Sequence, residues 1–468
     1  MKKHRKAYYE IEKVLQGDIY SIVILLGLRR VGKTTILRQL AERYNGYYID
    51  FRDSKDPESD YYNALDSSKD LILLDEIGYL PDFDAFLSSF EMNNEYADKK
   101  IVVTSSSYSS MRQLVHERLG GGRSYRVELF PLSFEEYLYF SDKIENYADI
   151  YESTDEDLQN FYRMKDLPQG MGFFISKEYM YDNFRDAEVA QLNQKYVVRS
   201  EILIQRQYAA VIDVIAYTLN YQLNIKRFGS TPSGRQEFEK DVKGLDLSQS
   251  LIGAANTVSD RLDFLDISHI LLYLLTSGFL FIDLLVDRDG FQGTDAVLSD
   301  LRTVKVESDL DTILRTYVFS VVSPLIYTRL LCDLEDIVGK FCSNRHLYGE
   351  LYELTVKSES IYNKYQDFGY TSYKYYDQRF GNTLSVDLYV PGQWSSKGLL
   401  LEAALGTKRG RDHSVVKILK DRKLIRVLTD ACGKWEFKSK YYRIGYPQAL
   451  LLVSNNKIYD LDATDVGD

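Results

Sequence analysis

The sequence predicts an α/β fold, with a parallel sheet and covering helices in the N-terminal part of the chain. Short apolar runs carry this prediction: Ser21–Leu26, Asp70–Leu74 and Lys100–Val103. Runs without polar alternation are typical of strands buried on both faces, as parallel strands between helices are. Tyr47–Phe51 and Tyr125–Phe130 are expected to be further strands of the same sheet.

A glycine-rich loop follows the first strand directly. Gly27–Thr35 has the form GxxxxGK[ST], and the helical pattern of Ile36–Leu40 comes next. A strand, such a loop and a helix form a P-loop, whose backbone N–H groups and helix N-terminus face phosphate oxygens. We expect Lys33 to reach the β- and γ-phosphates of ATP and the Thr34 hydroxyl to bind Mg²⁺. The expected nucleotide-binding residues are Gly27, Arg29, Arg30, Val31, Gly32, Lys33, Thr34 and Thr35.

The run that begins at Asp70 ends in two carboxylates, Asp75 and Glu76. Acids at the end of a lone strand usually mark only a solvated strand end. After a P-loop, however, they have the form of a Walker B element. Asp75 is then expected to hold Mg²⁺ and Glu76 to polarise the attacking water. Glu76 therefore favours ATP hydrolysis over nucleotide binding alone.

Hydroxyl side chains end the strand that begins at Lys100, at Thr104, Ser105 and Ser106. Ligands of open α/β sheets lie at the carboxyl ends of the strands, so a hydroxyl here is placed to sense the γ-phosphate. We assign this role to Ser105 or Ser106. The alternative is that the serines cap the helix expected near Ser110.

Arg118 and Arg123 precede the strand Tyr125–Phe130. Two interpretations stay open: an arginine that reaches the γ-phosphate bound by a neighbouring subunit, or a surface arginine. Arg123 is the better candidate for catalysis, because Gly120–Gly122 leaves it on an exposed turn.

The order of these motifs resembles that of a known family. Gly27–Thr35, Leu73–Ile77, Val103–Ser107, Gly122–Arg123 and Phe130–Tyr137 follow one another as they do in prokaryotic AAA-family ATPases of the STAND-like branch. The resemblance implies an AAA-type P-loop NTPase core at 1–140 and a helical lid at 141–200. It further implies a winged-helix-like region at 201–340 and a restriction-endonuclease-like α/β domain at 341–468.

The middle region is expected to be mostly helical. Asp266–Gly278 predicts an apolar helix ended by glycine, and Phe279–Asp283 predicts a strand after it, the outline of a winged helix. The polar residues expected on the surface of this helix are Ser268, His269 and Thr276. Helices that read DNA present Arg, Asn, Gln or Lys, so we favour a winged helix used for packing.

The C-terminal part predicts alternating helices and strands. The expected strands are Leu384–Val390, Gly398–Ala404 and the late run Ala449–Val453, and a helix is expected around Ser414–Arg422. Asp387 and Glu402 on these strands, with Glu350 as a third acid, resemble the metal-binding carboxylates of PD-(D/E)xK nucleases. Alanine at 404 stands where those enzymes have the lysine that activates water. We therefore expect a degenerate nuclease fold, with an ATP-regulated nuclease as the alternative function.

Basic residues gather at 408–426 in a chain whose net charge is −11. Two interpretations stay open for this stretch: contact with nucleic-acid phosphates, as in a nucleotide-regulated nucleic-acid-binding regulator, or a solvated helix face.

The composition of the chain excludes several other kinds of protein. The 3 cysteines, at 332, 342 and 432, are too scattered for a disulfide framework or a zinc site. Neither a membrane span nor a signal peptide is expected, so a cytoplasmic location is predicted. We expect an ATP- and Mg²⁺-dependent switch or motor that couples nucleotide state to an unidentified protein partner of the C-terminal domain. A homo-oligomer is the partner that the first interpretation of Arg123 requires, and the oligomeric state stays open.

Overall fold

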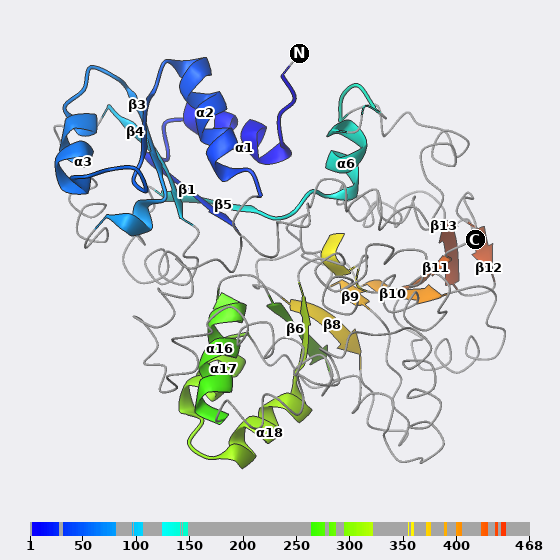
Figure 1. The fold of residues 1–468 in the computed structure, drawn as a ribbon. Helices are drawn as coiled ribbons and strands as arrows, with labels where there is room; N and C mark the ends of the chain where they lie inside the picture. The colour runs from blue at the N-terminus through cyan, green and yellow to red at the C-terminus, as the bar shows by residue number, and fades with distance from the viewer. Residues whose placement is uncertain are drawn as a thin grey trace, which may run out of the picture. The chain divides into compact units, whose positions relative to one another are not determined.

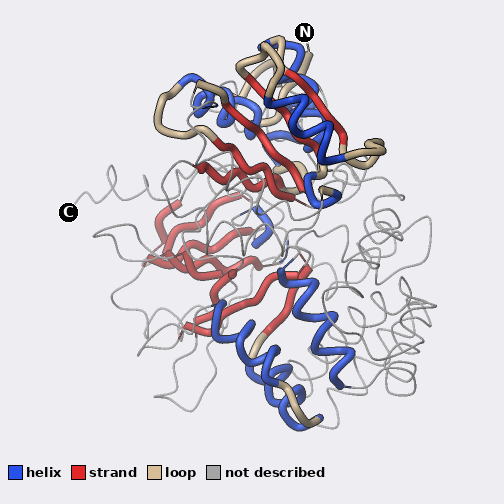
Figure 2. Tube along the Cα trace, turned by 90° about the vertical axis from the view of Figure 1, so that its left-hand side faces the viewer, coloured by secondary structure: helices blue, strands red, loops and turns tan. Residues whose placement is uncertain are grey.

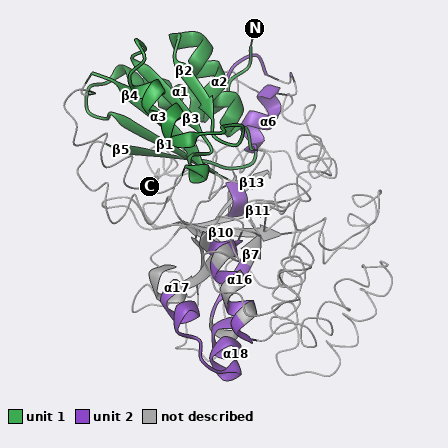
Figure 3. Cartoon of the chain, turned by 60° about the vertical axis from the view of Figure 1, so that its left-hand side comes forward, with its two compact units in different colours: residues 1–131, 177–191, 276–278 green, residues 132–176, 192–275, 279–468 purple. Residues whose placement is uncertain are grey.

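The computed structural model describes two separate parts of the chain. The described residues are 2–27, 31–80, 96, 98–105, 124–140, 142, 144–147, 264–276, 280–286, 294–321, 354, 357–359, 371–375, 388–390, 399–404, 423–428, 436–438 and 441–445. The first compact unit holds residues 1–131, 177–191 and 276–278, and the second holds the rest of the chain (Figure 3).

Helices and strands alternate in the first unit. The elements are α1 (Lys6–Gln16), β1 (Ile22–Gly27), α2 (Lys33–Tyr44), β2 (Tyr47–Asp50), α3 (Pro57–Leu65), β3 (Leu71–Asp75), the short 3₁₀ helix η1 (Ile77–Tyr79), β4 (Lys100–Ser105) and β5 (Ser124–Leu129). The strands expected from the apolar runs are therefore confirmed, and so is the helix after the glycine-rich loop.

The five strands of this unit form one parallel sheet in the order β2-β3-β4-β1-β5. From β1 the chain crosses through α2 to the far edge strand β2, then returns through α3 to β3. Since crossovers between parallel strands are right-handed, opposite directions of travel place their helices on opposite faces. Figure 1 shows α1 and α2 on one face and α3 on the other.

Side chains on the central strands form the core of the first unit. All residues of β1 and β3 are buried, as are those of β4 after Lys100. Each large apolar side chain removed from water there contributes about 1.5–3 kcal/mol. This packing fixes the carboxyl ends of β1, β3 and β4 next to one another, at one edge of the sheet.

The second unit contains the remaining described elements. They are α6 (Phe134–Phe140), α16 (Phe264–Thr276), β6 (Leu280–Val286), α17 (Thr294–Thr303), α18 (Glu307–Thr316), β7 (Val318–Val321), β8 (Thr371–Tyr375), β9 (Leu388–Val390), β10 (Leu399–Ala404), β11 (Lys423–Leu428), β12 (Glu436–Lys438) and β13 (Tyr441–Gly445). Two mixed sheets result, in the orders β7-β6-β8 and β12-β13-β11-β10-β9. Figure 2 distinguishes the helices and strands of both units by colour.

The expected apolar helix and following strand of the middle region are present as α16 and β6. The expectation that Ser268 is exposed was wrong. Its side chain is buried, and its hydroxyl donates to the Leu265 carbonyl, which satisfies it within the helix. The expected C-terminal helix around 414–422 and the strand at 449–453 lie outside the described residues.

A capping box begins α6. The Glu136 N–H donates to the Ser133 hydroxyl at 3.2 Å, and the Ser133 N–H donates to the Glu136 carboxylate at 3.3 Å. The Phe134 N–H donates to the buried carboxylate of Glu359 at 2.8 Å, across 225 positions of sequence. A negative charge at this end of a helix is favourable, so α6 is tied to a distant segment of its own unit.

Within the part of the chain that the structure describes, no helix is long and apolar enough to cross a membrane.

Candidate nucleotide-binding site

Two glycines shape the loop between β1 and α2 for different reasons. A Cβ at Gly27 would lie 2.2 Å from the Leu129 carbonyl oxygen, so the approach of β5 to β1 leaves no room for a side chain. Gly32 has open space around it but a φ of 107°, in the left-handed region that favours glycine. The first glycine thus permits close strand packing, and the second turns the backbone into α2.

Lys33 is the first residue of α2 and lies back over the loop. Its side chain is buried, and Nζ donates to the Gly27 carbonyl at 2.8 Å. The N–H groups of the first helical turn have no partners within the helix, and Gly32 supplies no capping side chain. An anion at this end of α2 would meet backbone donors, the helix dipole and the Lys33 ammonium.

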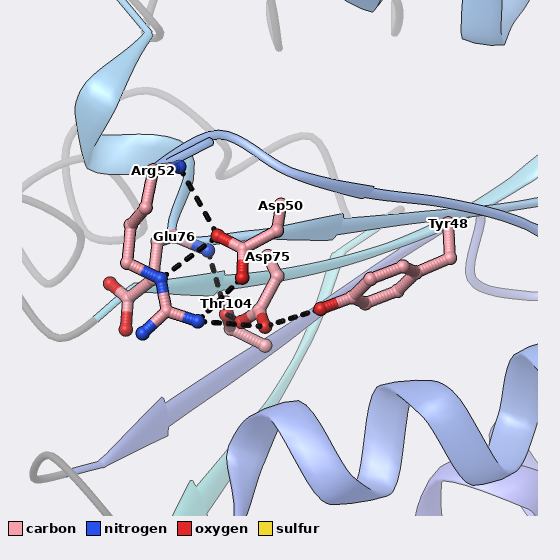
Figure 4. Close-up of polar contacts among 6 residues, drawn as sticks. All are labelled: Tyr48, Asp50, Arg52, Asp75, Glu76 and Thr104. Carbon is pink, nitrogen blue, oxygen red and sulfur yellow. Dashed lines mark hydrogen bonds and ion pairs between the residues drawn. The ribbon is translucent and has the colours of Figure 1, made fainter. Parts of the chain in front are cut away.

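Asp75 is fully buried at the end of β3, and two hydroxyls from neighbouring strands hold its carboxylate. Thr104, on β4, donates to Oδ1, and Tyr48, on β2, donates to Oδ2 at 2.9 Å (Figure 4). Hydrogen bonds from hydroxyls satisfy a buried carboxylate and fix its direction. Burial, and then the charge of Asp75, raise the pKa of Tyr48 to about 12, which keeps this hydroxyl a donor.

Arg52 lies beyond the end of β2 and pairs with Asp50. Its Nε donates to Asp50 Oδ1 at 2.9 Å, and its second guanidinium nitrogen contacts Oδ2 at 2.5 Å. Burial alone would raise the pKa of Asp50, but the hydrogen bonds from Arg52 outweigh it and hold that pKa below its usual value. The same bonds raise the pKa of Arg52, and the charges of Asp75 and Glu76 add to the effect.

The guanidinium of Arg52 also lies 3.9 Å from Asp75 Oδ2 (Figure 4). One cation thus faces the carboxylates at the ends of both β2 and β3. It offsets part of the negative charge that these strand ends bring together.

Glu76 occupies a left-handed backbone conformation, with φ 55° and ψ 50°. For a residue other than glycine this costs on the order of 1 kcal/mol and is common at functional sites. Its N–H donates to the Thr104 hydroxyl at 3.0 Å, and its carbonyl accepts from the Tyr79 N–H. One hydroxyl, that of Thr104, therefore positions both acidic residues: it donates to the Asp75 carboxylate and accepts from the Glu76 N–H.

The structure brings several of the predicted site residues to one edge of the sheet. Lys33, Asp75 and Glu76 lie at the carboxyl ends of β1 and β3, with Ser105 buried at the end of β4. Thr34 is half-buried and Thr35 exposed in the first turn of α2. Other predicted residues fall outside the described part of the chain: Arg29, Arg30, Ser106, Arg118, Arg123, Glu350 and Asp387.

Sequence reasoning missed the roles of Tyr48, Asp50 and Arg52, and it preferred Ser105 or Ser106 to Thr104. The rule that ligands gather at carboxyl strand ends applies to β2 as well, and it would have pointed to Asp50. Nothing in the sequence pairs Tyr48 or Thr104 with Asp75, because those contacts depend on strand order. The sensor role of Ser105 stays a prediction.

Comparison with known proteins finds a family model that matches the region of the glycine-rich loop and the parallel sheet. Residues 20–138 match the family model described as an AAA domain. An uncharacterized protein of Methanocaldococcus jannaschii is 23% identical over 283 residues, which are 52% of this chain and 55% of that protein. The chain thus matches about half the length of this curated relative.

Solved structures with some likeness include a Walker-type ATPase of Pyrococcus abyssi, with a TM-score of 0.34, 14% identity and coverage of 67% of this chain and 96% of that one. AMPPCP-bound DnaA from Aquifex aeolicus gives a TM-score of 0.25 and 18% identity over 55% of this chain and 87% of that one.

The family match covers the parallel sheet, the glycine-rich loop and the acidic strand end described above. Residues 20–138 are therefore similar to an AAA domain.

Proposed function

We propose that the protein binds ATP with Mg²⁺ at the carboxyl edge of the first-unit sheet and hydrolyses it, as an AAA-type switch or motor. Lys33 contacts the β- and γ-phosphates, Thr34 and Asp75 hold Mg²⁺, and Glu76 acts on the attacking water. The observation that carries this proposal is the arrangement at the carboxyl edge of the sheet. Lys33 follows β1, Asp75 and Glu76 end β3, and the strand between them, β4, carries the Thr104 hydroxyl that bonds to both acidic residues.

The residues present fit a nucleotide triphosphate with its metal. The N-terminus of α2, which has no side-chain cap from Gly32, and a buried lysine suit phosphate oxygens. Mg²⁺ prefers oxygen ligands and binds through one or two protein groups together with substrate phosphates, and a carboxylate and a threonine hydroxyl meet this need. Mg²⁺ supplies charge neutralisation at the phosphates.

The side chains of the chain perform the remaining chemistry. Lys33 offsets the negative charge that develops on the transferred phosphoryl group. Glu76 orients the water and accepts its proton, and the Thr104 hydroxyl fixes the backbone from which Glu76 projects. Arg123 of one subunit is proposed to face the γ-phosphate bound by another, which requires a homo-oligomer. Ser105 and the loop residues Arg29 and Arg30 are proposed to complete the nucleotide contacts.

Substitution of Glu76 by glutamine tests this function. Glu76→Gln keeps the shape but removes the base, so ATP should still bind while phosphate release falls by at least about 100-fold. Lys33→Ala should weaken ATP binding itself. Glu58→Gln, on the exposed surface of α3, is the matched control and should leave both properties unchanged. Phosphate release by Glu76→Gln at the wild-type rate would refute the proposed role of Glu76.

We further propose the finer architecture of the STAND-like branch: a lid at 141–200, a winged helix used for packing, and a nuclease-like C-terminal domain that couples nucleotide state to a protein partner in the cytoplasm. Helix α16 followed by β6 supports the winged helix. The mixed sheet that contains β9, β10 and β11 supports an α/β C-terminal domain.

An ATP-regulated nuclease is the second candidate function, and one observation favours it. Leu388 of β9 pairs with Leu401 of β10, and these residues are the sequence neighbours of Asp387 and Glu402. DNA or RNA cleavage that is lost in Asp387→Ala would support the nuclease. Without cleavage, binding to nucleic acid that weakens with salt and with charge reversal at Arg409 and Arg411 would support the regulator.

A further inference from the structure

Arg5 joins two backbone segments of the first unit that are far apart in sequence. One terminal nitrogen of its guanidinium, Nη1, donates to the Val31 carbonyl at 2.7 Å. The other, Nη2, donates to the Phe130 carbonyl at 2.9 Å and lies 3.4 Å from the Pro131 carbonyl. An arginine is suited to such a bridge, because its planar group presents separate donors in a fixed geometry.

The segments before and after Arg5 are held in place. The Lys3 carbonyl accepts from the Gln39 amide at 3.1 Å, which ties the backbone before Arg5 to α2. The ion pair of Lys2 with Glu42 is exposed to solvent and adds little to this attachment. On the other side, α1 is anchored to β5 because the Tyr125 hydroxyl donates to the Glu10 carboxylate at 2.8 Å. Arg5 therefore has limited freedom to leave the two segments that it bridges.

The first segment is the phosphate loop itself. Val31 directly precedes Gly32, whose left-handed conformation turns the chain into α2. The Val31 side chain is also buried, and its Cγ2 lies on the side of Gly27 that a Cβ would occupy. A shift of Val31 on nucleotide binding would therefore move the carbonyl to which Arg5 donates.

The second segment leads out of the sheet. Phe130 and Pro131 follow β5, and Ser133 then caps α6 in the capping box described above. The backbone carbonyls to which Arg5 donates thus belong to the short connection between β5 and α6.

We propose that Arg5 is a positioning residue that orders the phosphate loop and transmits its nucleotide-dependent movement to the Phe130–Pro131 connection and so to α6. This inference rests on the proposed function, since it requires nucleotide at the loop. It adds a route by which the presence of nucleotide in the loop can change the conformation of α6. The side chain that forms this route is not among the residues expected to contact the phosphates or the metal.

Two variants separate the charge of Arg5 from its geometry. Arg5→Met removes both, whereas Arg5→Lys keeps the charge but offers donors from one nitrogen, which cannot reproduce the two-sided bridge. Lys2→Met is the matched control, because it removes a cation from the same segment at an exposed site. Thermal unfolding identifies a variant that fails to fold; if Arg5→Met does, Arg5→Lys carries the test.

The measurements are the affinity for ATP, the steady-state kcat and KM, and amide hydrogen exchange of residues 130–140 with and without ATP and Mg²⁺. We expect ATP to change this exchange in the wild type and in Lys2→Met. In both Arg5 variants the change should be lost although ATP still binds, about tenfold more weakly in Arg5→Met, with KM affected more than kcat.

An exchange difference that persists in either Arg5 variant that folds overturns the inference. So does its absence in a wild type that binds ATP, or its loss in Lys2→Met. A wild type that does not bind ATP refutes the proposed function itself, which the affinity measurement distinguishes from a failure of the Arg5 inference.

Discussion

Replacement of Thr104 by valine tests the arrangement around the acidic strand end. Valine keeps the branched shape of threonine but removes the hydroxyl that donates to Asp75 and accepts from the Glu76 N–H. The buried N–H left without its acceptor costs about 1–3 kcal/mol, and loss of a hydrogen bond to an ionised group costs about 1.5–3 kcal/mol. Because Tyr48 still donates to Asp75, we expect a total near the lower end, about 3 kcal/mol.

Native-state hydrogen exchange of β3 and β4 measures this loss locally, which avoids treating the whole chain as one cooperative unit. A loss of about 3 kcal/mol corresponds to roughly 100-fold faster exchange of amides that open with the sheet. ATP turnover should fall as well, since Glu76 loses the contact that holds its backbone.

Thr104→Ser is the control, because it keeps the hydroxyl and loses one buried methyl group, worth about 1 kcal/mol. Equal losses in the serine and valine variants would show that packing, and not the hydroxyl, accounts for the effect. Exchange and turnover in the valine variant that match the wild type would refute the reasoning altogether.

Two further predictions concern the loop and the β2 strand. Gly27→Ala should lower the melting temperature much more than Gly32→Ala. The Cβ added at Gly27 would lie 2.2 Å from a carbonyl oxygen. The Cβ added at Gly32 meets no atom, and alanine there only has to adopt a φ of 107°, which costs about 1–2 kcal/mol. Similar melting temperatures in scanning calorimetry would contradict this. The pKa of Tyr48 is raised from 10.0 to about 12, so the stability due to its neutral hydroxyl is complete below pH 10 and is lost as the pH rises through about 12. Between pH 10 and 12, Tyr48→Phe should therefore lose less stability than the wild type does. Thermal unfolding across that pH range measures this difference, and equal losses in the two proteins would contradict the prediction.

Local patterns in the sequence determined the elements of the first-unit sheet and its glycine-rich loop. The buried strands β1, β3 and β4 follow from uninterrupted apolar runs, and the loop before α2 follows from the spacing of Gly27, Gly32 and Lys33. These signals are local because burial on both faces and backbone turning act on neighbouring residues. The acids at the end of β3 were recognisable for the same reason, since they follow their strand directly.

Only the tertiary structure decided which side chains form hydrogen bonds with those acidic residues. Tyr48 and Thr104 reach Asp75 because β2 and β4 flank β3, an order that sequence neighbours do not reveal. The bridge from Arg5 to Val31 and Phe130 likewise depends on α1 packing beside β5 and α2. Hydrogen bonds between distant segments arise from strand order and helix placement, whereas the strands themselves arise from local burial patterns. The sequence alone therefore predicted the nucleotide-binding elements, and the fold selected the residues that position them.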